Sequence, residues 1–226
     1  MDSVLTDDIN ARSRAVFDEL YARYPHLRAC EQDTSAALQL MTESFRHGGK
    51  LLLCGNGGSA ADCGHIVGEL MKGFCMERPL PEALSEAIGR ESSSVGVDGK
   101  LLCSSLQNGL PAIALTENTA LITAFSNDRA PQYAFAQQVH VLGSSGDVLF
   151  AISTSGNSEN VLAACAVAKA KSMGVVALSG EGGGELASIA DVCIRVPEHE
   201  TFKIQELHLP VYHALCLALE ATFFEG

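Results

Sequence analysis

The stretch Leu149-Phe150-Ala151-Ile152-Ser153-Thr154-Ser155-Gly156-Asn157-Ser158 decides the fold, because an apolar run there breaks into a hydroxyl-rich turn. The run from Asp147 to Ile152 predicts a buried strand, and the alanine-rich segment from Glu159 to Lys171 predicts a helix. The turn therefore opens a helix, where backbone N–H groups lack partners and the positive end of the dipole points outward. Such a turn can bind a phosphate without Lys or Arg, and an ordinary capped helix start is the alternative.

A second stretch has the same design. An apolar strand from Lys50 to Cys54 is followed by the turn Gly55-Asn56-Gly57-Gly58-Ser59 and by a predicted helix from Ala60 to Phe74. Two donor-rich turns at the carboxyl ends of parallel strands predict a ligand site. Neither turn continues into the Gly-Lys-Ser/Thr of a P-loop, and neither has the dinucleotide-binding pattern, so nucleotide chemistry is not indicated.

Strands alternate with helices along the rest of the chain, which predicts an α/β fold with a doubly wound parallel sheet and helices on both faces. At 226 residues the chain is long enough for one large core, and we expect a single domain over residues 1–226. The further strands are expected at Leu110–Leu115, Val175–Ser179 and Val192–Val196, and the further helices at Asn118–Asn127, Ala134–Leu142 and Glu185–Ile189.

Three additions surround this alternating core. Amphipathic patterns predict two helices within residues 8–47, namely Asp8–Tyr24 and Cys30–Phe45, which cover either their own domain or a second subunit. A long terminal helix is expected at Thr201–Phe224, with Pro210 either bending it or leaving the carbonyl of Glu206 without its helical partner. An insertion of about residues 75–110 is rich in Pro, Ser and Gly. We expect a short helix at 81–88, a mobile stretch at 91–99, and either a cover for the site or a surface excursion.

Composition narrows the class of protein. With 27 acidic and 15 basic residues the formal charge is −12, which argues against a nucleic-acid partner and against an anionic membrane surface. No apolar run approaches about 18 residues, and the acidic N-terminus lacks a signal pattern, so we expect a cytoplasmic protein. The eight cysteines are scattered without a Cys-x-x-Cys pair, so we expect small buried side chains rather than disulfides.

Two pairs of side chains carry candidate chemistry. His65 and Glu69 are four residues apart on one helical face, which suits a metal or proton transfer and also suits a plain surface contact. Gln205 and His213 are eight residues apart on the last helix, where a histidine is often a core or interface residue. The pair 127–128 is suited either to contact sugar hydroxyls or to cap the helix beginning near residue 131.

Several motifs occur together and in order: Cys54 to Ser59 with His65 and Glu69, then Ser126-Asn127-Asp128, then 146–158, then Ile204-Gln205-Glu206 with His213. In these motifs the sequence resembles the sugar isomerase (SIS) domain family, and within it most closely the phosphoheptose isomerases. The resemblance implies a flavodoxin-like fold and a homotetramer with sites between subunits. It also implies isomerisation of sedoheptulose 7-phosphate to D-glycero-D-manno-heptose 7-phosphate through an enediol.

The resemblance also implies roles for individual residues. Glu69 would move a proton between carbon 1 and carbon 2 of the sugar, with His213 as the partner acid and base. Zn²⁺, where family members bind it, would be held by residues matching His65, Glu69, Gln205 and His213. The substrate-binding residues implied by the motifs are Asn56, Gly57, Gly58, Ser59, Glu69, Asn127, Asp128, Ser153, Thr154, Ser155, Ser158 and Gln205.

The chain departs from the phosphoheptose isomerase pattern at two positions. Gly73 stands where an arginine is common, and Phe202 stands where an acidic residue is common, so both bear on which sugar is bound. The segments 124–129 and 183–187 also resemble the replication-initiator-associating protein, a tetrameric binding module that lacks the catalytic Glu and His. A phosphosugar-sensing or partner-binding protein and an isomerase of another sugar phosphate are therefore the alternatives.

Overall fold

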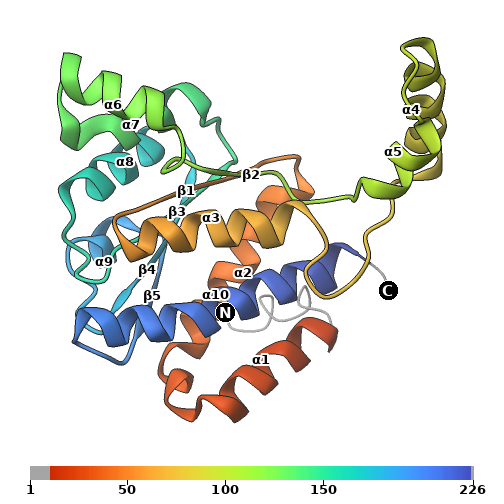
Figure 1. Cartoon of the computed structure of the whole chain (residues 1–226). Helices are drawn as coiled ribbons and strands as arrows, with labels where there is room; N and C mark the ends of the chain where they lie inside the picture. The colour runs from red at the N-terminus through yellow and green to blue at the C-terminus, as the bar shows by residue number, and fades with distance from the viewer. Residues whose placement is uncertain (1–10, 225–226) are drawn as a thin grey trace.

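A five-stranded parallel sheet forms the centre of the protein in the computed structural model, which describes residues 11–224. The strands lie in the order β2-β1-β3-β4-β5 (Figure 1). This is the flavodoxin-like order, and its direction reverses between β1 and β3, where open α/β sheets bind ligands. The doubly wound parallel sheet is thus confirmed. Its strands are β1 (Leu51–Gly55), β2 (Ala112–Ala114), β3 (Val148–Ile152), β4 (Gly174–Gly180) and β5 (Val192–Val196).

Helices precede, link and follow these strands. The α-helices are α1 (Ala11–Arg23), α2 (Glu31–Arg46), α3 (Gly58–Met71), α4 (Glu82–Ser94), α5 (Gly99–Ser105), α6 (Thr119–Asp128), α7 (Ala134–Leu142), α8 (Glu159–Ala170), α9 (Leu186–Ile189) and α10 (Thr201–Phe223). Two 3₁₀ turns are η1 (Pro25–Cys30) and η2 (Pro131–Tyr133). The predicted elements therefore exist, with ends shifted by a few residues. Residues 8–10 of the first predicted helix lie outside the described residues.

The sheet is buried on both faces, because successive side chains of each strand point to opposite sides. Leu51 and Leu53 of β1 belong to the core under α1, α2, α3 and α10, whereas Leu52 and Cys54 belong to the core under α7, α8 and α9. All five residues of β1 and of β3 are buried. The apolar runs of the sequence are therefore central strands of a two-sided sheet.

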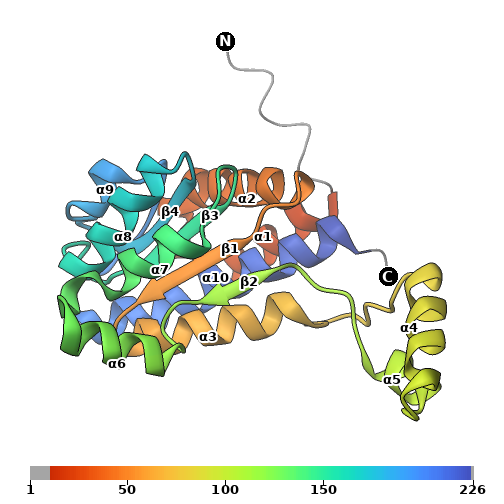
Figure 2. The ribbon, with the colours of Figure 1, turned by 90° about the horizontal axis from the view of Figure 1, so that it is seen from above.

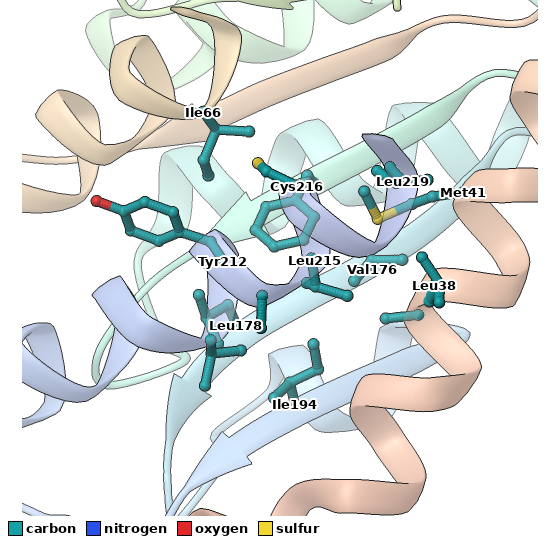
Figure 3. Close-up of a cluster of buried hydrophobic side chains, with 14 of the residues drawn as sticks. Leu38, Met41, Ile66, Val176, Leu178, Ile194, Tyr212, Leu215, Cys216 and Leu219 are labelled. Carbon is teal, nitrogen blue, oxygen red and sulfur yellow. The ribbon is translucent and has the colours of Figure 1, made fainter. Parts of the chain in front are cut away.

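Helix α10 lies between the sheet and α1. Leu215 and Leu219 of α10 pack in a buried cluster with Leu38 of α2 and Val176 of β4 (Figure 3). The Ser13 hydroxyl of α1 donates to the Ala218 carbonyl of α10 at 2.9 Å. The first of the added helices thus covers its own domain, and α10 continues as one helix through Pro210.

The insertion forms a helical hairpin, α4 and α5, that projects from the body of the molecule (Figure 2). The predicted mobile stretch at 91–99 was wrong for its first part, since α4 continues to Ser94. Ser92 and Ser93 donate their hydroxyls to the Gly89 carbonyl at 3.1 and 2.8 Å, and Ser94 donates to the Glu91 carbonyl at 2.7 Å. These bonds satisfy the serines inside a helix that serine normally disfavours.

Two further expectations concern the surface and the core. Among residues 11–224, no helix is long and apolar enough to cross a membrane. All eight cysteines are free thiols, and five of them are buried as expected. Cys75, at the start of the insertion, is exposed, and Cys103 and Cys193 are half-buried. The prediction of uniformly buried cysteines was therefore wrong at Cys75, which follows α3 on the surface.

Candidate active site

The two donor-rich turns lie side by side at the carboxyl ends of β1 and β3, which pair in parallel from residue 51 to residue 55. Asn56 in the first turn and Asn160 in the first turn of α8 exchange two amide hydrogen bonds, at 2.9 and 2.8 Å. Gly57 has a φ of 57°, a conformation that glycine adopts without strain. Asn160 was not among the predicted site residues, although it joins the two helix N-termini.

Side-chain hydroxyl groups form hydrogen bonds across the turn that follows β3. Ser153 and Ser158 are 3.0 Å apart at their Oγ atoms, and Ser155 Oγ accepts from the Asn157 N–H at 3.2 Å. The Thr154 carbonyl accepts from the Gly180 N–H at 3.0 Å, which ties the turn to the end of β4. Ser155 remains exposed while Ser153 is buried, so the turn presents donors outward from a fixed base. This arrangement suits a phosphate.

A second group of side chains lies further along α3. His65 Nε2 is 3.2 Å from Glu69 Oε1 and 3.4 Å from Nε2 of His213 on α10. The two imidazole rings are nearly perpendicular, with centroids 4.9 Å apart. Burial lowers the pKa of His213, and the neighbouring His65 lowers it further, against the opposing effect of Glu69. The structure thus brings three of the predicted site residues together, and we call them the His–Glu–His cluster.

Gln205 lies at the other end of this region. A Cβ atom placed on Gly58 would be 2.5 Å from Gln205 Nε2, so the amide packs on the glycine turn. Seven residues separate Gly58 from His65, which is about 10 Å along a helix. Gln205 therefore lies beside the phosphate turns, whereas the cluster lies two turns of helix away.

Asn127 and Asp128 end α6, and both are exposed. Asn127 Nδ2 donates to Asp128 Oδ1 at 2.9 Å. The capping alternative was wrong, because Ala130 occupies the cap position of the following 3₁₀ turn. Within the described chain, no hydrogen bond joins either residue to the phosphate turns, so their part in substrate binding stays a prediction.

The end of α3 is fixed by a buried ion pair that sequence reasoning missed. Arg78 Nη2 is 2.7 Å from Glu220 Oε1, with both side chains almost fully buried, and Arg78 Nη2 also donates to the Glu69 carbonyl at 3.2 Å. Glu220 accepts the backbone N–H groups of Phe74 and Cys75 at 2.8 and 2.9 Å. Burial raises the pKa of Glu220, but these N–H groups and Arg78 lower it more, so the pKa lies below its ordinary value.

Gly73 stands where an arginine is common in the phosphoheptose isomerases, and the insertion occupies the space beside it. Gly73 donates its N–H to Gln107 Oε1 at 2.7 Å, and a Cβ atom at residue 73 would lie 2.5 Å from that oxygen. Phe74, next in sequence, contacts the His213 ring with centroids 5.4 Å apart. A side chain at residue 73 would therefore collide with Gln107, so the returning end of the insertion requires a glycine at this position.

Comparison with known proteins identifies the family of the chain. The SIS domain family matches residues 17–97 and 102–180. The chain belongs to the SIS domain family. Within that family it is 42% identical over 190 residues to the phosphoheptose isomerase of Roseiflexus sp. (strain RS-1), covering 84% of this chain and 82% of the relative. It is 45% identical over 186 residues to the enzyme of that name from Thiobacillus denitrificans, covering 81% and 80%.

Solved structures of the SIS family agree with the fold. The phosphoheptose isomerase GmhA of Neisseria gonorrhoeae superposes with a TM-score of 0.70 at 34% identity, covering 93% of this chain and 97% of that one. A phosphoheptose isomerase from Francisella tularensis gives a TM-score of 0.69 at 32% identity, covering 92% and 96%. The sequence resemblance to this family is thereby confirmed.

Proposed function

We propose that this protein is a phosphoheptose isomerase that interconverts sedoheptulose 7-phosphate and D-glycero-D-manno-heptose 7-phosphate. The observation that carries the proposal is the His–Glu–His cluster, formed by His65 and Glu69 of α3 and His213 of α10. The turn that precedes α3 is bonded through Asn56 to the first turn of α8, beside the phosphate turn that follows β3. Relatives named phosphoheptose isomerase, at 42% and 45% identity over most of the chain, support the choice of substrate.

The phosphate turn holds the substrate by its charged end. The first-turn N–H groups of α8 and the Ser155 hydroxyl face outward, and Ser59 lies buried in the first turn of α3. Backbone donors at a helix N-terminus bind a dianion through the helix dipole. The chain's net charge of −12 disfavours anions at the surface in general, so a phosphate depends on such a local site.

Proton transfer occurs at the other end of the sugar. Glu69 removes a proton from carbon 1 of the ketose, and the electrons of that C–H bond form the carbon 1–carbon 2 double bond of an enediol. The carbon 2 oxygen takes up a proton as His213 acts as the acid. The proton held by Glu69 exchanges with solvent while the enediol is present, and Glu69 then protonates carbon 2 while His213 accepts the proton of the carbon 1 hydroxyl, which leaves an aldehyde. No oxidant or reductant is consumed.

The cluster also offers donors for Zn²⁺. His65 Nε2 is 3.2 Å from Glu69 Oε1 and 3.4 Å from His213 Nε2. These distances match the separation of about 3.3 Å between two ligand atoms of a tetrahedral zinc with bonds of about 2.0 Å. Among residues 11–224, no group of three His, Cys, Asp or Glu side chains could hold a metal ion as the side chains stand. Binding by His65, Glu69 and His213, with Gln205 as a fourth ligand, therefore requires side-chain rotation. A bound zinc would supply positive charge to the enediolate.

We further propose that the protein assembles as a homotetramer with sites between subunits. An apolar groove of about 190 Å³ beside His213 lies between α1 and α10, and Leu209 at its edge is 41% exposed. A second subunit placed on this groove would border the cluster. Light scattering after gel filtration is expected to give about four times the chain mass of 23.8 kDa. A monomer at micromolar concentration would contradict the assembly.

A cytoplasmic location is also part of the proposal, and the eight free thiols support it because reducing compartments keep cysteines unpaired.

The experiment that tests the function is a product assay. Sedoheptulose 7-phosphate and, in parallel, fructose 6-phosphate are incubated with the protein, with and without Zn²⁺, and the products are identified by NMR. We expect an aldose heptose 7-phosphate from the first sugar. Turnover of fructose 6-phosphate alone would assign another sugar phosphate. Binding of the heptose phosphate without turnover would assign a sensor or adaptor instead of an enzyme.

A further inference from the structure

A tyrosine and an aspartate lie behind the His–Glu–His cluster, on the side facing the core. Tyr212 is almost fully buried, and its ring lies edge-on to the rings of His65 and His213 at 5.6 and 5.0 Å. Figure 3 shows the Tyr212 ring beside Ile66, with its oxygen pointing away from the apolar side chains. That oxygen is 3.0 Å from His65 Nδ1 and 3.1 Å from Asp62 Oδ1.

The protons in this chain of groups can be assigned from the hydrogen-bonding capacity of each group. Tyr212 has one hydroxyl proton, and it donates that proton to the Asp62 carboxylate, which has only lone pairs to offer. A phenol has an ordinary pKa of about 10, so the hydroxyl keeps its proton near neutral pH. The phenol oxygen can then only accept from His65 Nδ1, so Nδ1 carries the hydrogen.

We propose that Asp62 and Tyr212 are positioning residues that hold His65 as the Nδ1–H tautomer, with the lone pair of Nε2 directed between Glu69 and His213. The spacing of residues supports this role, since Asp62 precedes His65 by one turn on the same face of α3. Tyr212 comes from α10, the helix that also carries His213. Both helices are thus tied together behind the cluster.

The Nδ1–H tautomer of His65 also determines what the opposite side of its ring, Nε2, offers to Glu69 and His213. Nε2 of His65 and Oε1 of Glu69 would face each other at 3.2 Å with lone pairs only, so a cation is stabilised between them. A proton or a metal ion entering the cluster is then shared by His65, Glu69 and His213. The inference about zinc rests on the proposed function, whereas the tautomer itself is a property of the metal-free chain.

The test uses the full-length protein with Tyr212→Phe, which keeps the packed ring and removes the hydroxyl. Long-range ¹H–¹⁵N NMR of the metal-free protein reads the tautomer of His65. We expect the Nδ1–H form in the unmodified protein and a mixture containing the Nε2–H form in the variant. Zinc affinity, measured by competition with a chelator, is expected to fall 10- to 100-fold, as for lost outer-shell partners of other metal ligands.

Tyr21→Phe is the matched control, because Tyr21 is a second buried tyrosine of the same apolar core, and its ring stacks on Phe17 and lies under Arg28. This variant is expected to leave both the tautomer and the zinc affinity unchanged. The Nε2–H tautomer in the unmodified protein would overturn the proposal, and so would equal tautomers in Tyr212→Phe and its parent. Because the NMR reading needs neither sugar nor zinc, it fails or succeeds independently of the isomerase assay.

Discussion

The two ends of helix α3 solve different chemical problems in different ways. At Ser59 the protein presents backbone N–H groups and hydroxyls at the switch point of the sheet, held by contacts within and between neighbouring turns. At His65 and Glu69 it presents ionisable side chains, held by Tyr212 of α10 and by a carbonyl contact with Arg78 of the insertion. Binding is thus assigned to local backbone geometry, and proton transfer to long-range packing.

This difference explains why only one end of α3 has a functional signature that can be recognised in the sequence. A strand, a Gly- and Ser-rich turn and a helix are contiguous in sequence, so the phosphate end has a local signature. The proton-transfer end depends on residues about 150 positions apart, such as His65 and Tyr212. Substitutions at the phosphate end of α3 should therefore change substrate binding, whereas substitutions at the proton-transfer end should change the rate of catalysis or the free energy of unfolding.

The largest expected effect is at Glu69. Glu69→Gln removes the base while preserving the size of the side chain, so kcat should fall by about 10²- to 10⁴-fold, the usual contribution of a general base. Substrate affinity, measured by calorimetry, should change little, because the phosphate turn is untouched. Glu82→Gln on the projecting hairpin is the control. A Glu69→Gln protein that keeps full turnover would show that the cluster is not the proton-transfer site.

The next largest effect is on folding. Glu220→Ala leaves Arg78 buried and unpaired, and breaking a buried pair in this way typically costs about 3–5 kcal/mol of unfolding free energy. The control is Glu31→Ala, which removes an exposed partner of Arg28 at 3.4 Å and should change stability by less than about 1 kcal/mol. Denaturant titration measures both. Equal effects for the two variants would remove Arg78 and Glu220 as the anchor of α3.

The same ion pair predicts a dependence on pH. The pKa of Glu220 is lowered on folding, so its contribution is complete above the unfolded value of about 4.3 and is lost as the pH falls through the lower folded value. Unfolding free energy measured from pH 6 to pH 3 should therefore drop more steeply in the parent than in Glu220→Ala. Parallel curves for the two proteins would contradict this assignment.

A smaller effect is expected at the phosphate end. Ser155→Asp places a carboxylate where the phosphate would bind, so like charges should weaken sugar-phosphate binding by at least about tenfold, or 1.4 kcal/mol. Ser105→Asp on the hairpin adds the same charge elsewhere and is the control for net charge. Calorimetry with sedoheptulose 7-phosphate compares them. Unchanged affinity in Ser155→Asp would remove this turn from the binding site.

The smallest effect is expected on the hairpin itself. Val95 is 73% exposed at the end of α4, so Val95→Ser should change unfolding free energy by no more than about 0.5 kcal/mol. Thermal unfolding of the isolated protein measures this change. A clearly larger loss of stability, or a change in oligomeric state, would show that the hairpin is packed against another surface in solution.

Much of the fold was predictable because apolar periodicity reports burial directly. The helix at Ala134–Leu142 and the strand at Val192–Val196 have the predicted bounds. The prediction failed at 91–94, since the serine composition suggested a mobile stretch, whereas the serine hydroxyls bond to carbonyls of the preceding turn within a helix. An argument from composition considers each residue alone, so it leaves out hydrogen bonds from serine side chains to the carbonyls three or four residues earlier in a helix.

The candidate site was predictable in part. The spacing of His65 and Glu69 places them on one face of a helix, and the contact between them follows from it. Asp62 and Tyr212 had no signal of their own, because a buried tyrosine in an apolar helix is typical of a core. Arg78 and Glu220 are 142 residues apart, so only the folded structure pairs them. Such long-range partners are what sequence spacing leaves out.

The central claim, that Glu69 moves a proton between two carbons of a sugar phosphate, is tested most directly by solvent exchange. Sedoheptulose 7-phosphate is incubated with the protein in deuterated water, and NMR follows deuterium at carbon 1 and carbon 2. The account predicts an aldose product with deuterium at carbon 2, and its loss in Glu69→Gln. Substrate that binds without exchange at either carbon, or exchange that persists in Glu69→Gln, would contradict it.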